Sequence, residues 1–381
     1  MTRVNVNPEL LRWARERAGM SVDRLMGRFP KYDLWERGEG QPTLKQLEGF
    51  AKATYTPVGY LFLPAPTVER MPIPDFRTIN NQHIAHPSPN LLETVYLCQQ
   101  RQAWYREYAN FARAEPRAFM GSAHLDSVVE DTAENMRQAL RFDLDARRDY
   151  PTWTEALRHF IAQADDLGVM VMCSGVVLNN NRRKLDPNEF RGFAMADPLA
   201  PLVFVNGADT KAAQMFTLAH ELAHLWLGQS ALSNSDASAV PDHEVERWCN
   251  RVAAEMLVPL RVLRLEFQPH EELAMEVNRL ARRFKVSTLV ILRRIFDAGG
   301  LSRAEFYGAY DAELQRLRAR PKGSGGDFYL TQAARVSKRF ARALVESTLE
   351  GQTLYRDAFC MLGISKVGTF HELGRSLGFP I

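Results

Sequence analysis

The sequence predicts a mainly α-helical protein with one small β-sheet, an α+β fold. Most of the chain consists of segments whose apolar residues recur at helical spacing. Strand character is confined to three short runs close together, GVMVMCSGVV, FRGFAMAD and PLVFVNG. At 381 residues the chain is longer than one domain usually requires, so two to four domains are expected.

The first 66 residues read as short helices. NPELLRWARERAG has helical periodicity and ends at Gly19. Ser21 is expected to cap a second helix, and Thr43 a later one that follows Pro42. The Pro-rich stretch LFLPAPTVERMPIPDFRT then predicts a domain boundary near residues 64–80.

Three longer helical patterns follow, at about residues 90–114, 127–142 and 153–166, and lead into the strand candidates. The next helix is expected at residues 210–227, followed by the polar loop 229–242 and a helix at 243–257 that stops before Pro259. Helices are expected to continue to about residue 320, where PKGSGGD forms a flexible linker. The last 50 residues or so are expected to be mostly helical. The expected domains are an N-terminal helical domain (1–66), a helical connector (67–150), a core with the sheet (151–265), a helical extension (266–320) and a basic helical C-terminal region (321–381).

Composition excludes several classes of protein. No apolar run reaches the roughly 18 residues that a membrane span requires, and the N-terminus lacks an apolar signal core. The four cysteines form no CxxC pair, so a cytoplasmic protein without disulfides is expected. The net charge of +3 is too small to indicate nucleic-acid binding. A basic tract at residues 316–342 fits either an acidic partner or a solvated helix face.

The stretch FTLAHELAHLWLG carries the chemistry. His220 and His224 are four residues apart, so their rings lie on one helical face, as two nitrogen ligands of Zn²⁺ require. Glu221 lies beside that face and can act as a general base without binding the metal, which is the HExxH pattern. The other sides of the helix are apolar, so the helix should be buried. Burying two unpartnered imidazoles is costly, and a metal removes that cost.

A catalytic zinc needs a third protein ligand and one open position. Gly228 is followed by no histidine at the spacing of the metzincins, so that class is excluded. The segment HEVERWCNRVAAEMLVP offers Glu244, Glu246 and Glu255 as alternatives. We favour Glu246, because it shares a helical stripe with the small Ala253, which would allow a close approach to the first helix.

Four segments in this order, FRGFAMAD, APLVFVNG, FTLAHELAHLWLG and ERWCNRVAAEMLVP, resemble the ImmA/IrrE family of zinc metallopeptidases. The resemblance covers roughly residues 165–262. It implies a minimal thermolysin-like zincin core, with a small sheet packed on the active-site helix, and it places the glutamate ligand on Glu246. Family members are soluble bacterial proteases that cleave a partner repressor after a stress or signal.

The N-terminal segment resembles an XRE-type helix-turn-helix unit, with one departure. From Ser21 to Glu36 the chain advances fifteen residues, where the usual unit needs about nineteen. The missing residues belong to the turn and the start of the recognition helix. FPKYD replaces them, and Pro30 is expected to begin the third helix. DNA binding and a role in protein contact both stay open.

The expected function is a zinc-dependent endopeptidase. Zn²⁺ is held by His220, His224 and Glu246, and Glu221 takes the proton of the attacking water. His243 and the tyrosines are candidates for stabilising the oxyanion. The strand APLVFVNG either adds an extended substrate to the sheet or is a central core strand. The polar loop 229–242 is placed to limit access.

The resemblance implies a protein partner, either a repressor or a toxin-like protein, because the layout is that of a regulator fused to a protease. The alternative is a transcriptional regulator or antitoxin whose metallopeptidase fold mainly binds its partner. The intact Glu221 favours the peptidase, since a structural zinc site needs no general base.

Overall fold

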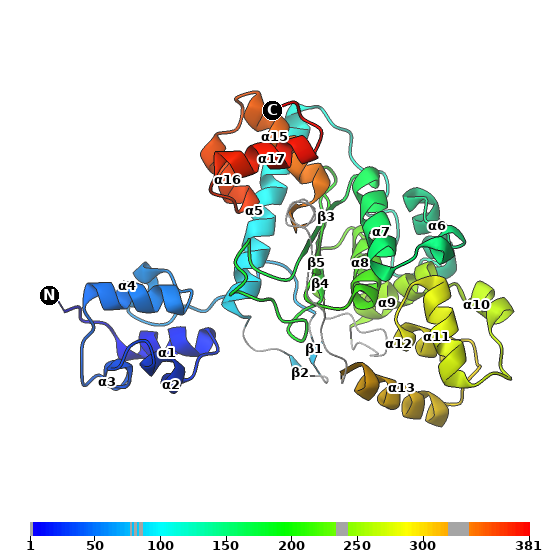
Figure 1. Ribbon diagram of the computed structural model, residues 1–381, viewed down its shortest axis with the longest axis horizontal. Coiled ribbons are helices and arrows are strands. Elements are labelled where there is room, and N and C mark those ends of the chain that lie inside the picture. The colour runs from blue at the N-terminus through cyan, green and yellow to red at the C-terminus, as the bar shows by residue number, and fades with distance from the viewer. Residues whose placement is uncertain (1–2, 77, 80–81, 84–86, 234–242, 319–334) are drawn as a thin grey trace. The chain divides into compact units, whose positions relative to one another are not determined.

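The computed structural model describes residues 3–76, 78–79, 82–83, 87–233, 243–318 and 335–381 (Figure 1). The chain divides into two compact units. The first unit comprises Met1–Pro72 and Ile84–Tyr96, and the second comprises Ile73–His83 and Leu97–Ile381. The expected linker PKGSGGD and residues 234–242 of the polar loop lie outside the described residues.

The first unit is built from short helices around its own apolar core. They are α1 (Pro8–Arg17), α2 (Val22–Met26), α3 (Tyr32–Glu36), α4 (Leu44–Ala53) and the 3₁₀ helix η1 (Val58–Phe62). The side chains of Ser21 and Thr43 cap α2 and α4 as expected, and Thr43 forms a capping box with Gln46.

Helix α3 begins at Tyr32, so the expectation that Pro30 begins it is wrong. The reason is burial. Tyr32 is completely buried, and its hydroxyl donates a hydrogen bond to the carbonyl of Leu11, so the chain must still be turning at Pro30. Trp35 and Glu36 are buried as well, and Arg15 forms an ion pair with Glu36. Most residues of this five-residue helix are therefore buried in the core of the unit.

Two short strands, β1 (Thr78–Ile79) and β2 (Gln82–His83), pair antiparallel. Helix α5 (Pro89–Phe111) begins in the first unit and continues in the second. The remaining helices are α6 (Val129–Leu140), η2 (Ala146–Asp149), α7 (Trp153–Leu167), α8 (Lys211–Trp226), α9 (Glu244–Leu257), α10 (Leu260–Glu266), α11 (Leu273–Phe284), α12 (Thr288–Asp297), α13 (Arg303–Arg318), α15 (Lys338–Leu349), α16 (Tyr355–Leu362) and α17 (Val367–Ser376). None of the helices in the described ranges has the length and apolar character needed to cross a bilayer. The prediction of a mainly helical chain with a small sheet is confirmed.

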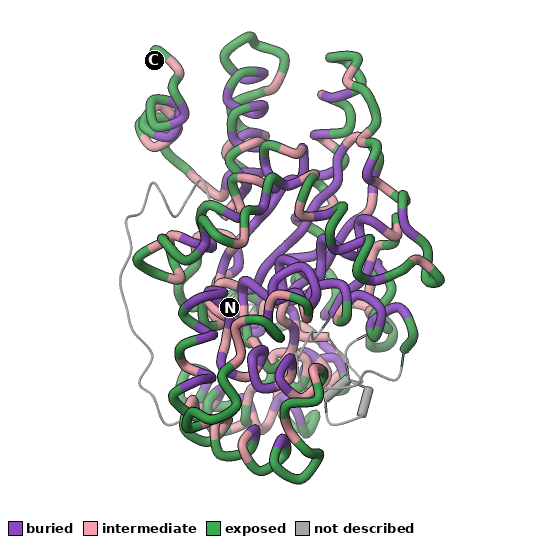
Figure 2. The backbone as a smooth tube through the Cα atoms, turned by 90° about the vertical axis from the view of Figure 1, so that its right-hand side faces the viewer, coloured by how far each residue is buried: buried purple, intermediate pink, exposed green. Residues whose placement is uncertain are grey.

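The main sheet has four strands in the order β3-β5-β4-β6. They are β3 (Met170–Ser174), β4 (Gly192–Met195), β5 (Leu202–Asn206) and β6 (Ala231–Ser233). β3 and β5 are parallel, whereas β4 is antiparallel to both β5 and β6. The strands are buried almost throughout, while the outer helices alternate between buried and exposed residues (Figure 2).

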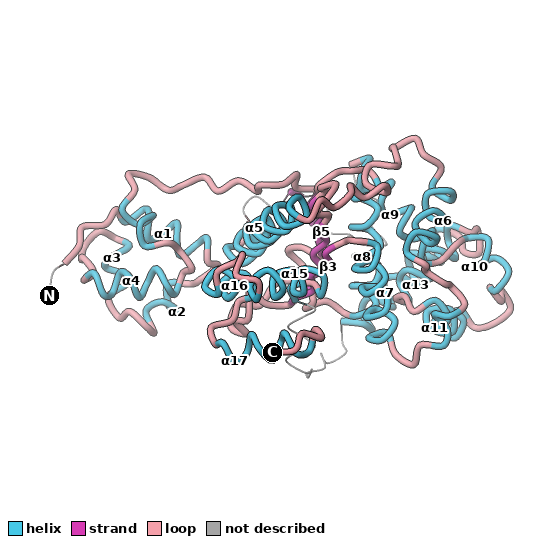
Figure 3. The backbone as a smooth tube through the Cα atoms, turned by 90° about the horizontal axis from the view of Figure 1, so that it is seen from above, coloured by secondary structure: helices cyan, strands magenta, loops and turns pink. Residues whose placement is uncertain are grey.

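Helices cover both faces of the sheet. α7 and α8 lie on one side, and α15 with the second-unit part of α5 lies on the other (Figure 3). On the second side, the side chain of Gln102 donates hydrogen bonds to the carbonyls of Met195 and Ala200. Helix α8 lies between the sheet and α9, so its histidines are enclosed.

The structure decides between the two alternatives for one strand and corrects the expectation for another. β5, the strand in APLVFVNG, is paired on both sides, so it offers no free edge for an extended substrate. β6 lies in the segment that we expected to be a polar loop. Its three residues are completely buried despite their polar surroundings, because they extend the sheet beside β4.

Candidate metal centre

Helix α8 is set between the sheet and α9. The side chain of Thr210 caps its first turn by accepting a hydrogen bond from the amide of Ala213. Every residue from Gln214 to Trp226 is buried. His220, Glu221 and His224 have no exposed surface at all. The expected burial of the motif helix is confirmed.

Helix α9 supplies the third group. It starts directly after His243, whose side chain makes no capping hydrogen bond, and it ends before Pro259. Glu246 lies in its first turn on the buried face and is only 3% exposed. A carboxylate at this depth needs positive partners or a bound cation.

The three donor groups converge. His224 Nε2 lies 3.0 Å from Glu246 Oε1, and His220 Nε2 lies 3.2 Å from Glu246 Oε2. The two Nε2 atoms lie 3.2 Å from each other. Among the described residues this is the group of histidines, cysteines and acids that could hold a metal ion.

These separations fit a tetrahedral zinc site. With bonds of about 2.0–2.1 Å, two corners of the tetrahedron lie about 3.3 Å apart. The histidines are not satisfied as core residues either. Their Nδ1 atoms are buried without a hydrogen-bond partner in the described part of the chain, and both Nε2 atoms face the same carboxylate. A divalent cation between the three groups would bind both Nε2 atoms and the carboxylate at once.

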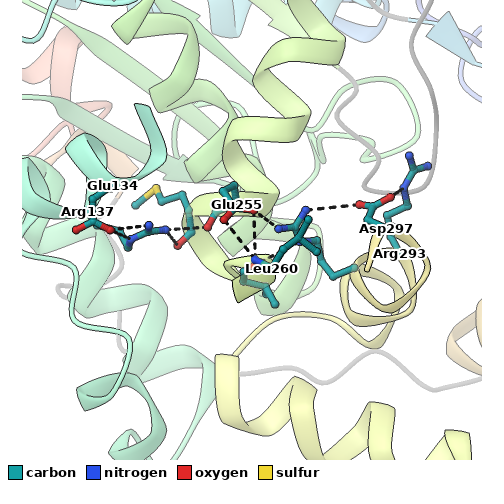
Figure 4. Close-up of polar contacts among 9 residues, drawn as sticks. Glu134, Arg137, Glu255, Leu260, Arg293 and Asp297 are labelled. Carbon is teal, nitrogen blue, oxygen red and sulfur yellow. Dashed lines mark hydrogen bonds and ion pairs between the residues drawn. The ribbon is translucent and has the colours of Figure 1, made fainter. Parts of the chain in front are cut away.

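Glu244 and Glu255, the two alternatives for the third ligand, are not in this cluster. Glu244 is exposed. Glu255 lies at the other end of α9, where it forms an ion pair with Arg294 and accepts hydrogen bonds of 3.3 Å from the amide of Leu260 (Figure 4). The structure thus brings together the three residues that we favoured as ligands.

Glu221 lies between α8 and strand β4, where Gly192 makes room for it. A Cβ atom at Gly192 would lie 3.0 Å from Glu221 Oε1, 2.6 Å from Thr217 Cγ2 and 2.9 Å from the carbonyl oxygen of Phe204. The absence of a side chain therefore allows α8 to pack this closely on the sheet. The sequence analysis did not single out this glycine.

Burial dominates the electrostatics of the site. It raises the pKa of Glu221 well above its ordinary value, the charge of Glu246 raises it further, and the nearby hydroxyl of Ser233 opposes the rise. Burial also favours the neutral form of Glu246, but the two imidazoles outweigh it and lower the pKa of this carboxyl. Burial lowers the pKa of His224, although Glu246 opposes that effect. A metal binds the neutral form of an imidazole and the ionised form of a carboxyl, so the lowered pKa values of His224 and Glu246 both favour binding.

Two further polar residues border the cluster. The hydroxyl of Ser233 donates to Glu246 Oε1 over 3.3 Å and lies 3.4 Å from His224 Nε2. The side-chain amide of Asn250, one turn after Glu246, has no hydrogen-bond partner within the described ranges. The sequence offered a weak signal for Asn250, its place on the same stripe, and none for Ser233 in a serine-rich segment.

His243, a candidate for stabilising the oxyanion, lies at the rim of the site. Its ring packs on Phe76 at 4.3 Å between centroids, and it lies near enough to His224 to contribute to lowering the pKa of that residue. Phe76 belongs to a segment that borders β6. There the amide of Leu232 donates to the carbonyl of Pro74, and the amide of Phe76 donates to the carbonyl of Leu232. His243 is exposed, so it can meet a substrate that enters from this side.

Comparisons with known proteins identify two parts of the chain. Residues 336–376 match the family model of a domain of unknown function, DUF8813. No curated protein and no solved structure matches the chain. Residues 164–296 match the family model of the IrrE N-terminal-like domain, Peptidase_M78. The segment that contains the whole three-residue cluster therefore supports the resemblance to the ImmA/IrrE family.

Proposed function

We propose that this protein is a zinc-dependent endopeptidase that cleaves a protein partner. The observation that carries the proposal is the buried convergence of His220, His224 and Glu246, with Glu221 next to them on α8. A structural zinc site does not require this additional carboxylate. The match of residues 164–296 to a peptidase family supports the same function.

His220, His224 and Glu246 would hold the metal. A zinc ion in this position supplies Lewis acidity, which polarises a peptide carbonyl and makes a water molecule easier to deprotonate. Glu221 accepts the proton of the attacking water on its carboxylate and passes it to the leaving amine. The positive charge of a bound ion would favour ionised Glu221, against the burial that raises its pKa.

The partner is proposed from the resemblance alone, as a repressor or a toxin-like protein. Such a substrate would reach the site past β6 and His243, because the central strand β5 has no free edge. An extended segment of the partner could contact the exposed His243, which we propose as the group that stabilises charge on the scissile carbonyl.

The test combines metal content with cleavage. The wild-type protein, purified without chelators, should contain one zinc per chain and cleave members of a peptide library, as read by mass spectrometry. The double variant His220→Ala/His224→Ala should lose both properties. Stoichiometric zinc in the double variant would reject the metal site. Full zinc in a wild-type protein that cleaves neither the library nor a co-expressed partner would favour a binding function.

A further inference from the structure

We propose that Ser233 supplies a fourth donor to the metal centre through its hydroxyl oxygen. The inference rests on the proposed metal site and deepens it. Ser233 Oγ lies 3.4 Å from His224 Nε2 and 3.3 Å from Glu246 Oε1, and these two atoms are 3.0 Å apart. The three atoms form a nearly equilateral triangle, whose sides match the distance of about 3.3 Å between corners of a tetrahedral zinc site.

The alternative role for a hydroxyl here is to hold a water molecule on the metal. Such a hydroxyl would lie one hydrogen bond, about 2.8 Å, beyond the water and therefore farther from the other donors. Ser233 Oγ instead lies 3.4 Å from His224 Nε2 and 3.3 Å from Glu246 Oε1, the separation expected between two donors of one tetrahedral site.

The backbone fixes the hydroxyl in this place. Ser233 is completely buried and pairs with Gly192 of β4, and its carbonyl accepts a hydrogen bond of 3.3 Å from the amide of Arg191. On the other side of β6, Leu232 exchanges hydrogen bonds of 2.9 and 3.0 Å with Pro74 and Phe76. β6 is thus held between β4 and the segment 74–76.

A fourth protein donor changes what the site can do. Structural zinc sites are closed by four protein ligands, whereas catalytic sites keep one position for water or substrate. The described conformation is therefore the closed form of the site. Hydrolysis requires the Ser233 hydroxyl to leave the fourth metal position. A neutral hydroxyl is the donor of the four that is easiest to displace, since the other three are imidazoles and a carboxylate.

Cobalt substitution tests the contact without relying on activity. In Co²⁺-loaded Ser233→Cys, the new thiolate should give a sulfur-to-cobalt charge-transfer band in the near ultraviolet. The wild type sets the baseline, because Cys249 on α9 is a native buried thiol. Ser174→Cys is the matched control, because Ser174 is a buried strand serine that bonds to the carbonyl of Val176. Cobalt bound to Ser233→Cys with no new band would overturn the proposal.

A second variant tests the closed state. Ser233→Ala should retain the metal and bind acetohydroxamate, which needs an open metal position, at least about tenfold more tightly than the wild type, since no closed form competes. Equal affinity in the two proteins would overturn the closed state. Failure of the wild type to bind any cobalt would reject the proposed metal centre itself. A charge-transfer band without cleavage by any variant would leave the Ser233 contact in place and reject the peptidase.

Discussion

Gly192 shows at the scale of one residue how the site depends on packing. We predict that Gly192→Ala moves Glu221 and Thr217 and lowers the free energy of unfolding by about 1–3 kcal/mol, the usual cost of overpacking a core. Cleavage should fall while zinc content is kept, because the three atoms nearest to a Cβ at Gly192 belong to none of His220, His224 and Glu246. Urea unfolding and metal analysis measure the two effects. Gly308→Ala is the control, since a Cβ there meets nothing within 4 Å; an equal loss in both variants would contradict this account.

The choice of Glu246 over its neighbours is also a residue-scale claim. Glu246→Gln should weaken zinc binding by more than the roughly 10- to 100-fold typical of residues that only support a ligand. Glu244→Gln should have no effect, because Glu244 is exposed. Competition with a chromophoric chelator gives the affinities. A larger effect of Glu255→Gln on zinc affinity would show that the third ligand is misassigned.

At the scale of elements, helix α9 carries two buried glutamates, one at each end, whose charges are balanced in different ways. Glu246 at its start faces the cluster, and Glu255 near its end is neutralised by Arg294 of α12. We predict that Arg294→Ala lowers the free energy of unfolding by about 3–5 kcal/mol, because it leaves a buried carboxylate unpaired. Arg293→Ala, which removes a partly exposed pair with Asp297 and a contact with the Phe296 ring, should cost less than about 1 kcal/mol. Similar losses in both variants would contradict the burial argument.

The junction of α7 and α15 predicts a pH dependence. Burial raises the pKa of Asp165 from 3.8 to about 7, although a hydrogen bond from Ser337 opposes the rise. The folded state therefore keeps this proton between about pH 4 and 7 while the unfolded state has lost it, so the contribution of Asp165 to stability falls as pH rises through this window. The difference in unfolding free energy between wild type and Asp165→Asn should shift in favour of the variant over this range. A difference that is constant with pH would contradict it.

Elements were predictable where sequence periodicity coincides with burial. The motif helix and the three main strands follow from local patterns. β6 was not predictable, because a three-residue strand in a polar segment is specified by its pairing with β4. The start of α3 was missed for a similar reason, since the packing of Tyr32 against α1 decides it. Ser233 and Gly192 could be recognised only once β6 and β4 were placed opposite each other.

At the scale of the whole molecule, long-range contacts decide what the sequence left open. The described arginines of the basic tract are largely engaged within the chain. Arg335 donates to Asn179, Arg339 to the carbonyl of Asp165, and Arg342 to the carbonyl of Leu377. The first two contacts attach the C-terminal segment to the core, and the third lies within that segment; together they leave fewer charges for an acidic partner than composition suggests.

The central claim concerns Glu221, and one variant tests it most directly. In Glu221→Gln the metal ligands are intact, so the protein should still contain one zinc per chain. Its cleavage of the peptide library should nevertheless fall by about two to four orders of magnitude, the usual contribution of a general base. Cleavage at the wild-type rate by zinc-loaded Glu221→Gln would contradict the account, because the site would then hydrolyse peptides without the carboxylate that distinguishes it from a structural zinc site.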